Sequence, residues 1–200
     1  MRNLKLGGRY HSLSMISSPI FVERSEVLKL HLYSVNTQYV NYLRKYDCKV
    51  YENKENLTTH TRKYLGIVLR INELNYFIPM SSPKKSDYIN YESKLIRKDT
   101  KTIIRIHINN HLYGTLRISN MIPVPYEELK PYNTADEKDL KYREVILGEL
   151  RFIQKNTEKI IKCAQIVYFQ KMKELDVAYI KNTVDFKVLE EKSKLWKKAK

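Results

Sequence analysis

The spacing of apolar and polar residues predicts a β-sheet in the first part of the chain. Four apolar runs rich in β-branched and aromatic residues form two hairpin patterns, 64–71 with 76–80 and 102–108 with 112–118. The polar stretches 72–75 and 109–111 between them contain the asparagines that tight hairpin turns favour. Residues 28–33 alternate apolar with polar side chains and predict one more strand before the first hairpin.

The apolar period changes to that of helices in the last third of the chain. Thr134 and Glu137 have the spacing of a capping box, which predicts a helix that starts there and runs to about residue 155. Asn156 is expected to cap a second helix, and Asp185 precedes the apolar stripe of a third. Strands followed by helices predict one α+β domain, in which a small antiparallel sheet carries packed and C-terminal helices.

A shorter helix is predicted directly after the first strand. Asn36 is a good N-cap, and Tyr39, Leu43 and Tyr46 follow it at helical spacing. Two interpretations of Tyr39 stay open: its ring packs in the core, or its phenol projects from the first turn toward a functional site. The spacing alone favours the core.

Residues 1–27 lack the periodicity of the sequence that follows them. They contain Gly7, Gly8, several serines and Pro19, and no apolar run long enough for a signal peptide. We expect a loosely ordered N-terminal extension, which a start codon read too far upstream would also explain. The functional domain is expected over residues 28–200.

The composition favours a polyanionic partner. Lysine and arginine total 37 against 22 acidic residues, a formal net charge of +15, and the 16 tyrosines offer rings on which unpaired RNA bases can stack. No apolar run approaches the roughly 20 residues that span a bilayer. Cys48 and Cys163 fit neither a metal-binding nor a disulfide pattern. We therefore expect a protein of the reducing cytoplasm that binds RNA, and these patterns indicate no metal or other cofactor.

The stretch 79–85, with the sequence PMSSPKK, carries the most chemistry. Pro83 cannot donate to a sheet and holds Ser82 extended, so Ser82 and Lys84 should leave the sheet on a stiffened turn. A hydroxyl and an ammonium group at one place suit a reaction in which a phosphate is held and a proton is moved. The alternative is a solvated surface turn.

Two further groups are candidates for the same chemistry. Arg62 lies where the first hairpin begins, and a guanidinium group can hold a phosphate in a bidentate fork. A solvated surface arginine is the alternative. His107 and His111 flank the second hairpin turn and either form an acid–base pair for RNA cleavage or lie there incidentally.

Five pieces of the chain, in order, resemble the ToxN/AbiQ family of endoribonuclease toxins from type III toxin-antitoxin and phage abortive-infection systems. The pieces begin at YSV (33–35) with Tyr39 and continue through YLGIV (64–68), PMSSPKK (79–85), NMIP (120–123) and LRFIQKN (150–156), with LEEK (189–192) near the end. Residues 1–26 have no counterpart in the family that can be placed, and the polar loop 47–61 differs too freely for residues to be carried across.

The resemblance implies a Kid/MazF-like sheet, an SH3-like barrel with added helices, and metal-independent cleavage of RNA to a 2′,3′-cyclic phosphate and a 5′-hydroxyl. It also implies inhibition by a repeated, pseudoknotted RNA antitoxin and a role in phage defence. By position, the matches are the active-site pair Ser82 and Lys84 and the RNA-binding set Tyr39, Arg62, Ser81 and Lys85.

A rival function is a non-catalytic RNA-binding module with a basic, SH3-like sheet. Cleavage of RNA in the presence of a chelator separates the two functions, whereas RNA affinity does not. For the toxin, we expect each protein to hold one RNA in its groove and to touch a second through Lys155, Lys159 and Lys162. Alternating contacts of this kind predict a closed toxin-RNA hetero-oligomer.

Overall fold

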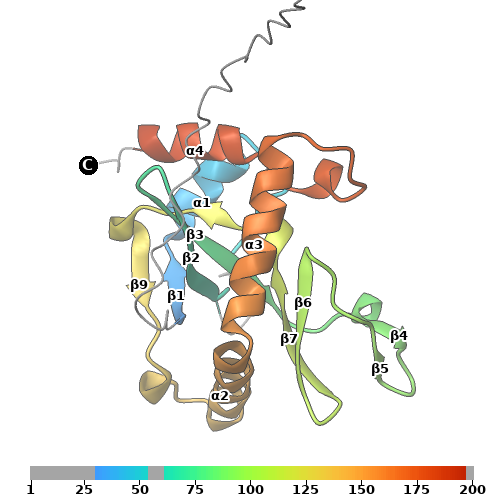
Figure 1. Ribbon diagram of the computed structural model, residues 1–200. Helices are drawn as coiled ribbons and strands as arrows, with labels where there is room; N and C mark the ends of the chain where they lie inside the picture. The colour runs from blue at the N-terminus through green and yellow to red at the C-terminus, as the bar shows by residue number, and fades with distance from the viewer. Residues whose placement is uncertain (1–29, 54–60, 197–200) are drawn as a thin grey trace, which may run out of the picture.

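An antiparallel sheet forms the centre of the molecule (Figure 1). The computed structural model describes residues 30–53 and 61–196; the predicted extension, residues 1–27, therefore lies outside the described residues. Seven strands form the main sheet in the order β6-β7-β3-β2-β1-β9, and β8 pairs with β3 off this path. Their bounds are β1 His31–Val35, β2 Tyr64–Ile71, β3 Leu74–Ser81, β6 Ile103–Ile108, β7 His111–Arg117, β8 Ile122–Pro123 and β9 Leu129–Pro131.

The predicted α+β class is confirmed, but the sheet of the described residues is not a closed barrel. Its strand path has two ends, β6 and β9, which do not pair with each other. The strand β9 is three residues long and ends in Pro131, which has no N–H to donate to a further strand. The structure therefore shows an open antiparallel sheet with four helices.

Both predicted hairpins are confirmed, with tighter turns than expected. Asn72 and Glu73 have φ angles of 48° and 65°, and Asn109 and Asn110 have 48° and 62°. Two successive left-handed residues make the type I′ turn that matches the twist of a hairpin. As a result, Leu74 already belongs to β3, and the first hairpin brings β3 to a central position between β2 and β7.

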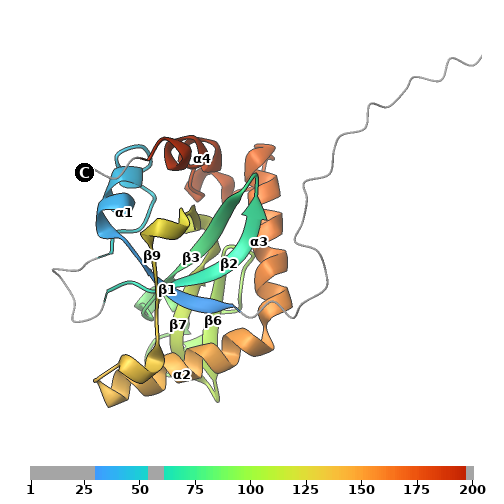
Figure 2. The same ribbon diagram turned by 90° about the vertical axis from the view of Figure 1, so that its left-hand side faces the viewer.

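The described residues form four α-helices, which surround the sheet (Figure 2). The helix α3 runs along the sheet, α2 lies across one end of it, and α1 and α4 pack together at the other end. Their bounds are α1 Thr37–Arg44, α2 Leu140–Lys155, α3 Thr157–Met172 and α4 Phe186–Leu195. Short 3₁₀ turns occupy Lys85–Asp87, Ile118–Asn120, Tyr126–Glu128, Thr134–Asp136 and Ile180–Asn182.

The predicted helix starts are confirmed at Asn36, Asn156 and Asp185, although the side chain of Asn156 makes no capping hydrogen bond, and wrong at Thr134. The side chains of Asn36 and Asp185 accept hydrogen bonds from the backbone at the starts of α1 and α4. The capping box at Thr134 does not start α2. Glu137 instead accepts a hydrogen bond from Tyr132, and Asp139 caps the helix by accepting from two backbone N–H groups.

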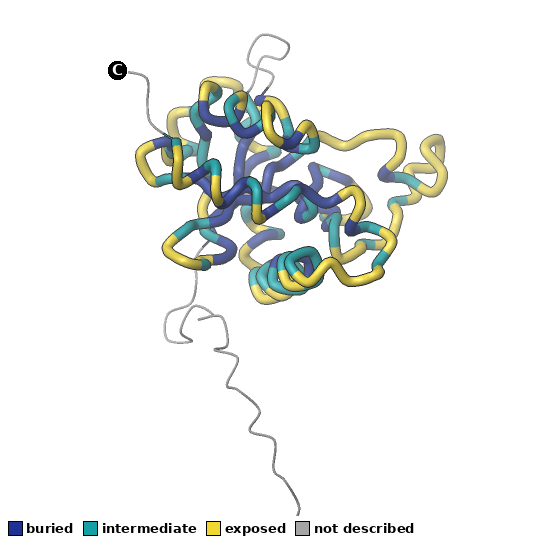
Figure 3. Tube along the Cα trace, turned by 90° about the horizontal axis from the view of Figure 1, so that it is seen from above, coloured by how far each residue is buried: buried dark blue, intermediate teal, exposed yellow. Residues whose placement is uncertain are grey.

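A small second sheet projects from the side of the molecule (Figure 1). Its strands are β4 Tyr88–Asn90 and β5 Leu95–Ile96. The other described residues pack around one core, and Figure 3 shows the buried residues gathered in the middle of the fold. None of the helices in the described ranges is long and apolar enough to cross a membrane.

Candidate functional site

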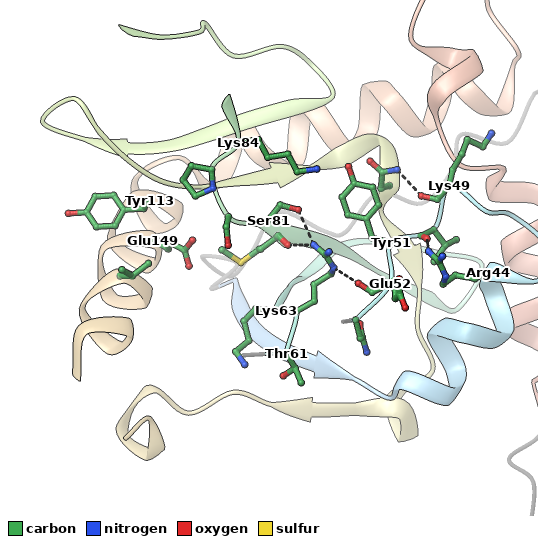
Figure 4. A pocket seen from close by; sticks show the side chains of 18 of the residues that line it. Arg44, Lys49, Tyr51, Glu52, Thr61, Lys63, Ser81, Lys84, Tyr113 and Glu149 are labelled. Carbon is green, nitrogen blue, oxygen red and sulfur yellow. Dashed lines mark hydrogen bonds between the residues drawn. The ribbon is translucent and has the colours of Figure 1, made fainter. Parts of the chain in front are cut away.

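A large groove opens where β3 ends (Figure 4). It has a volume of about 880 Å³ and is bounded by the segment after α1, the start of β2, the end of β3, β7 and α2. The polar side chains on its wall include Arg44, Lys49, Tyr51, Arg62, Lys63, Ser81, Ser82, Lys84, Tyr113, Tyr142 and Glu149. The groove therefore combines cations, hydroxyl groups and two carboxyl groups, those of Glu52 and Glu149.

The serine-lysine turn leaves the sheet at the predicted place. Ser81 is the last residue of β3 and pairs with Thr115 of β7. Ser82, Pro83 and Lys84 follow it, are exposed and line the groove. The register of the central strand β3 thus fixes the positions at which the chain presents the hydroxyl groups of Ser81 and Ser82.

A buried carboxylate holds the other end of this turn. Asp87 is only 1% exposed, and its Oδ2 accepts a hydrogen bond of 3.0 Å from the backbone N–H of Lys84. Arg117 and Arg105 of the second hairpin approach the same carboxylate at 3.2 and 3.3 Å. Lys84 is therefore anchored through its backbone while its side chain stays exposed.

Arg62 lies in the groove wall and contacts the serine turn. Its guanidinium group donates to the carbonyl oxygens of Glu52 and Met80, and to Ser81 Oγ at 2.9 Å. It also lies over the ring of Tyr51, with its central carbon 4.9 Å from the ring centre. Burial lowers the pKa of Arg62 from its ordinary value. The structure thus brings Arg62 and Ser81 together, and phosphate binding by Arg62 stays a prediction.

Lys63 is a cation of the groove that sequence reasoning missed. It is 8% exposed, and its ammonium nitrogen lies 4.1 Å from the centre of the Tyr132 ring. Burial lowers its pKa from the ordinary lysine value. A lysine at the start of a strand looks solvated in sequence, and only the packing of Tyr132 from β9 and the turn after it covers this one.

Glu149 of α2 is the second missed residue. It is 7% exposed, lines the groove, and has its pKa raised to about 8 by burial. Sequence reasoning missed it because a glutamate in an amphipathic helix is typical of a solvent-facing position. Tyr142 and Val145, which also line the groove, precede it on the same helix.

Tyr39 is buried and does not line the groove, so the structure gives no support to its expected contact with RNA. Its side chain is 0% exposed, and its hydroxyl lies 2.7 Å from the carbonyl oxygen of Pro123 and 2.9 Å from Ser193 Oγ. Trp196 packs edge-on against its ring. Burial raises its pKa well above the ordinary tyrosine value. The core interpretation of Tyr39 is therefore the one that holds.

Three further candidates lie outside the groove. Lys85 is exposed on the side of the small second sheet, with its ammonium nitrogen 5.5 Å from the Tyr91 ring centre. His107 and His111 are exposed and contact the rings of Phe152 and Tyr113 instead of each other. Within the described residues, no three His, Cys, Asp or Glu side chains are grouped so as to hold a metal ion.

Comparisons with known proteins identify the family. Endoribonuclease AbiQ of Lactococcus lactis subsp. lactis is 36% identical over 185 residues, which cover 90% of this chain and 97% of the relative. A solved structure of AbiQ, a lactococcal anti-phage endoribonuclease of a type III toxin-antitoxin system, has a TM-score of 0.70 and 34% identity over 84% of this chain and 97% of its own.

A second solved structure comes from work on selective toxin inhibition by a non-coding RNA pseudoknot. It has a TM-score of 0.70 and 27% identity, and covers 86% of this chain and 99% of its own. The model of the family "Toxin ToxN, type III toxin-antitoxin system" matches residues 31–194. The chain therefore belongs to the ToxN family of endoribonuclease toxins of type III toxin-antitoxin systems.

Proposed function

We propose that this protein cleaves RNA in the groove at the end of β3, with Ser82 and Lys84 as its catalytic residues. The observation that carries the proposal is the anchored turn, which presents a hydroxyl and an ammonium group at the wall of a groove rich in cations. Ser82 holds an oxygen of the scissile phosphate, and Lys84 neutralises the charge that develops on it. The 2′-hydroxyl of the RNA attacks, which leaves a 2′,3′-cyclic phosphate and a 5′-hydroxyl.

Neighbouring side chains support the binding of the substrate. Arg62, Lys63 and Ser81 lie in the same groove wall, so a phosphodiester there meets several hydrogen-bond donors. Because the groove supplies its own cations, we propose that the cleavage needs no metal. Lys85, beside the groove, extends this basic surface toward the small second sheet.

The test is RNA cleavage by purified protein with a chelator present. Ser82→Ala and Lys84→Ala are expected to lose about 10²- to 10⁴-fold in rate while remaining folded. Ser86→Ala and Lys138→Ala replace the same residue types at exposed positions outside the groove and serve as matched controls. RNA left intact by the wild-type protein would instead indicate the RNA-binding module, and unchanged rates in both variants would refute the assigned residues.

We further propose that an RNA antitoxin inhibits the protein by occupying this groove, in the cytoplasm and in defence against phage. The support is the toxin of similar structure that a non-coding RNA pseudoknot inhibits. A second contact face is open at Lys155 and Lys162, which are exposed, whereas Lys159 pairs with Asp99 at 2.5 Å. The expected product is a closed toxin-RNA assembly. The Kid/MazF-like character of the sheet stays a prediction.

Native mass measurement over a range of salt concentration tests this assembly. The complex is expected to contain RNA in a fixed ratio to protein and to weaken by about 10³- to 10⁵-fold between 50 and 200 mM salt if six to ten phosphates are neutralised. A neutralised protein free of nucleic acid would contradict it.

A further inference from the structure

Glu149 is a buried carboxyl group that faces the groove without a partner. No described residue is placed to form a hydrogen bond or an ion pair with its carboxyl group. Figure 4 shows it reaching from α2 toward the strand end that carries Ser81. A helix that packs across the end of a sheet has thus placed an acid beside the proposed reaction site.

Gly114 makes this approach possible. A Cβ atom at Gly114 would lie 2.4 Å from Glu149 Oε1 and 3.2 Å from the carbonyl oxygen of Ser81. The carboxyl group and the end of β3 therefore meet at one point on β7, which any larger residue would fill. Because Ser82 is the next residue along the chain, Glu149 lies near the start of the turn, whereas Asp87 binds the backbone N–H of Lys84 at its other end.

The groups around Glu149 leave its proton in place. Tyr142 of its own helix and Tyr132 after β9 interact with it electrostatically, and Tyr113 of β7 and Arg62 and Lys63 at the start of β2 line the same groove. Burial raises the pKa of Glu149 to about 8. At neutral pH the group is therefore an acid that can give up a proton inside the groove.

We propose that Glu149 is the general acid of the cleavage, donating its proton to the 5′-oxygen that leaves. The inference rests on the proposed function, since it assigns a role within the same reaction. It goes beyond Ser82 and Lys84, which hold the phosphate but do not account for the proton on the leaving group.

The proton balance of the step is complete. The 2′-oxygen forms a bond to phosphorus and releases its proton to water, while the bond from phosphorus to the 5′-oxygen breaks. The electron pair of that bond stays on the 5′-oxygen, which takes the proton of Glu149. The carboxylate then regains a proton from water, so the RNA is rearranged and cut with no net change of the enzyme.

A leaving group that needs no proton tests this role directly. In an RNA with sulfur in place of the bridging 5′-oxygen, the leaving group is a thiolate, because a thiol has a pKa of about 8.5. Glu149→Gln is expected to cut ordinary RNA about 10²- to 10⁴-fold more slowly than the wild type, and to cut the sulfur-containing RNA at nearly the wild-type rate. Cleavage of the sulfur-containing RNA also shows that the variant is folded.

The matched control is Glu144→Gln, an exposed glutamate on the same helix. It should leave both rates unchanged. Equal losses on both RNAs in Glu149→Gln would overturn the general-acid role while leaving the proposed function intact, and so would no loss on ordinary RNA. If the wild-type protein cuts neither RNA, the proposed function itself fails.

Discussion

Two buried carboxyl groups flank the turn that carries Ser82 and Lys84, and their surroundings are opposite. Asp87, at the end of the turn, forms ion pairs with Arg105 and Arg117 and accepts a hydrogen bond from the backbone of Lys84. Glu149, on the groove side, has no described hydrogen-bond or ion-pair partner.

The difference shows how one fold uses the same functional group for two purposes. A carboxylate that two guanidinium groups hold in place fixes geometry, because its oxygens and their donors define one arrangement of the chain. A carboxyl group buried without such partners favours its neutral form and keeps a proton available. The turn therefore has a rigid support on one side and a proton donor on the other.

The largest expected effect comes from breaking the support. Asp87→Ala leaves Arg105 and Arg117 buried without their counter-ion and should lower the free energy of unfolding by about 3–5 kcal/mol. Urea denaturation measures this loss. Glu92→Gln, an exposed acid on the small second sheet next to this turn, is the control and should change stability by less than about 0.5 kcal/mol.

A variant of the arginine partner shows whether the loss comes from the ion pairs. With Arg117 already replaced by Met, Asp87→Ala should cost less than it does in the wild-type protein, because one buried charge has been removed beforehand. The same cost in both backgrounds would mean that Asp87 stabilises the turn without its arginines.

The position of the turn could be predicted from the sequence because it depends on local chemistry. Asparagines at the hairpin turns set the register of β3, whose pairing ends at Ser81, two residues before Pro83. The groove around the turn could not be predicted in the same way. Asp87 meets Arg117 across 30 residues of sequence, and no local pattern encodes that contact.

Two other outcomes also depended on distant partners. Tyr39 lies in the core, where its hydroxyl group forms a hydrogen bond with Ser193, a residue 154 positions away in the sequence. Thr134 and Asp139 are both acceptable caps for α2. The predicted capping box required the side chain of Glu137, which instead accepts a hydrogen bond from Tyr132, and Asp139 caps the helix. Glu149 stayed hidden because its burial arises only when α2 packs against β7.

The smaller expected effect is the dependence of stability on pH through Glu149. The unfolded chain loses this proton near the ordinary glutamate pKa of about 4.3, whereas the folded protein keeps it up to a pKa of about 8. Between those values the folded state binds more protons, so the contribution of Glu149 to the free energy of unfolding falls by about 1.4 kcal/mol per pH unit. It levels off above pH 8.

Glu149→Gln removes this contribution and nothing else that titrates, so the two proteins can be compared by urea denaturation at each pH. The stability of the wild type relative to Glu149→Gln should fall by about 3 kcal/mol from pH 5 to pH 7. Glu144→Gln, whose side chain is exposed, should follow the wild type at both values. If the difference in stability between the wild type and Glu149→Gln stays constant with pH, the carboxyl group ionises in the folded protein as a solvent-facing glutamate does. It would then hold no proton at neutral pH.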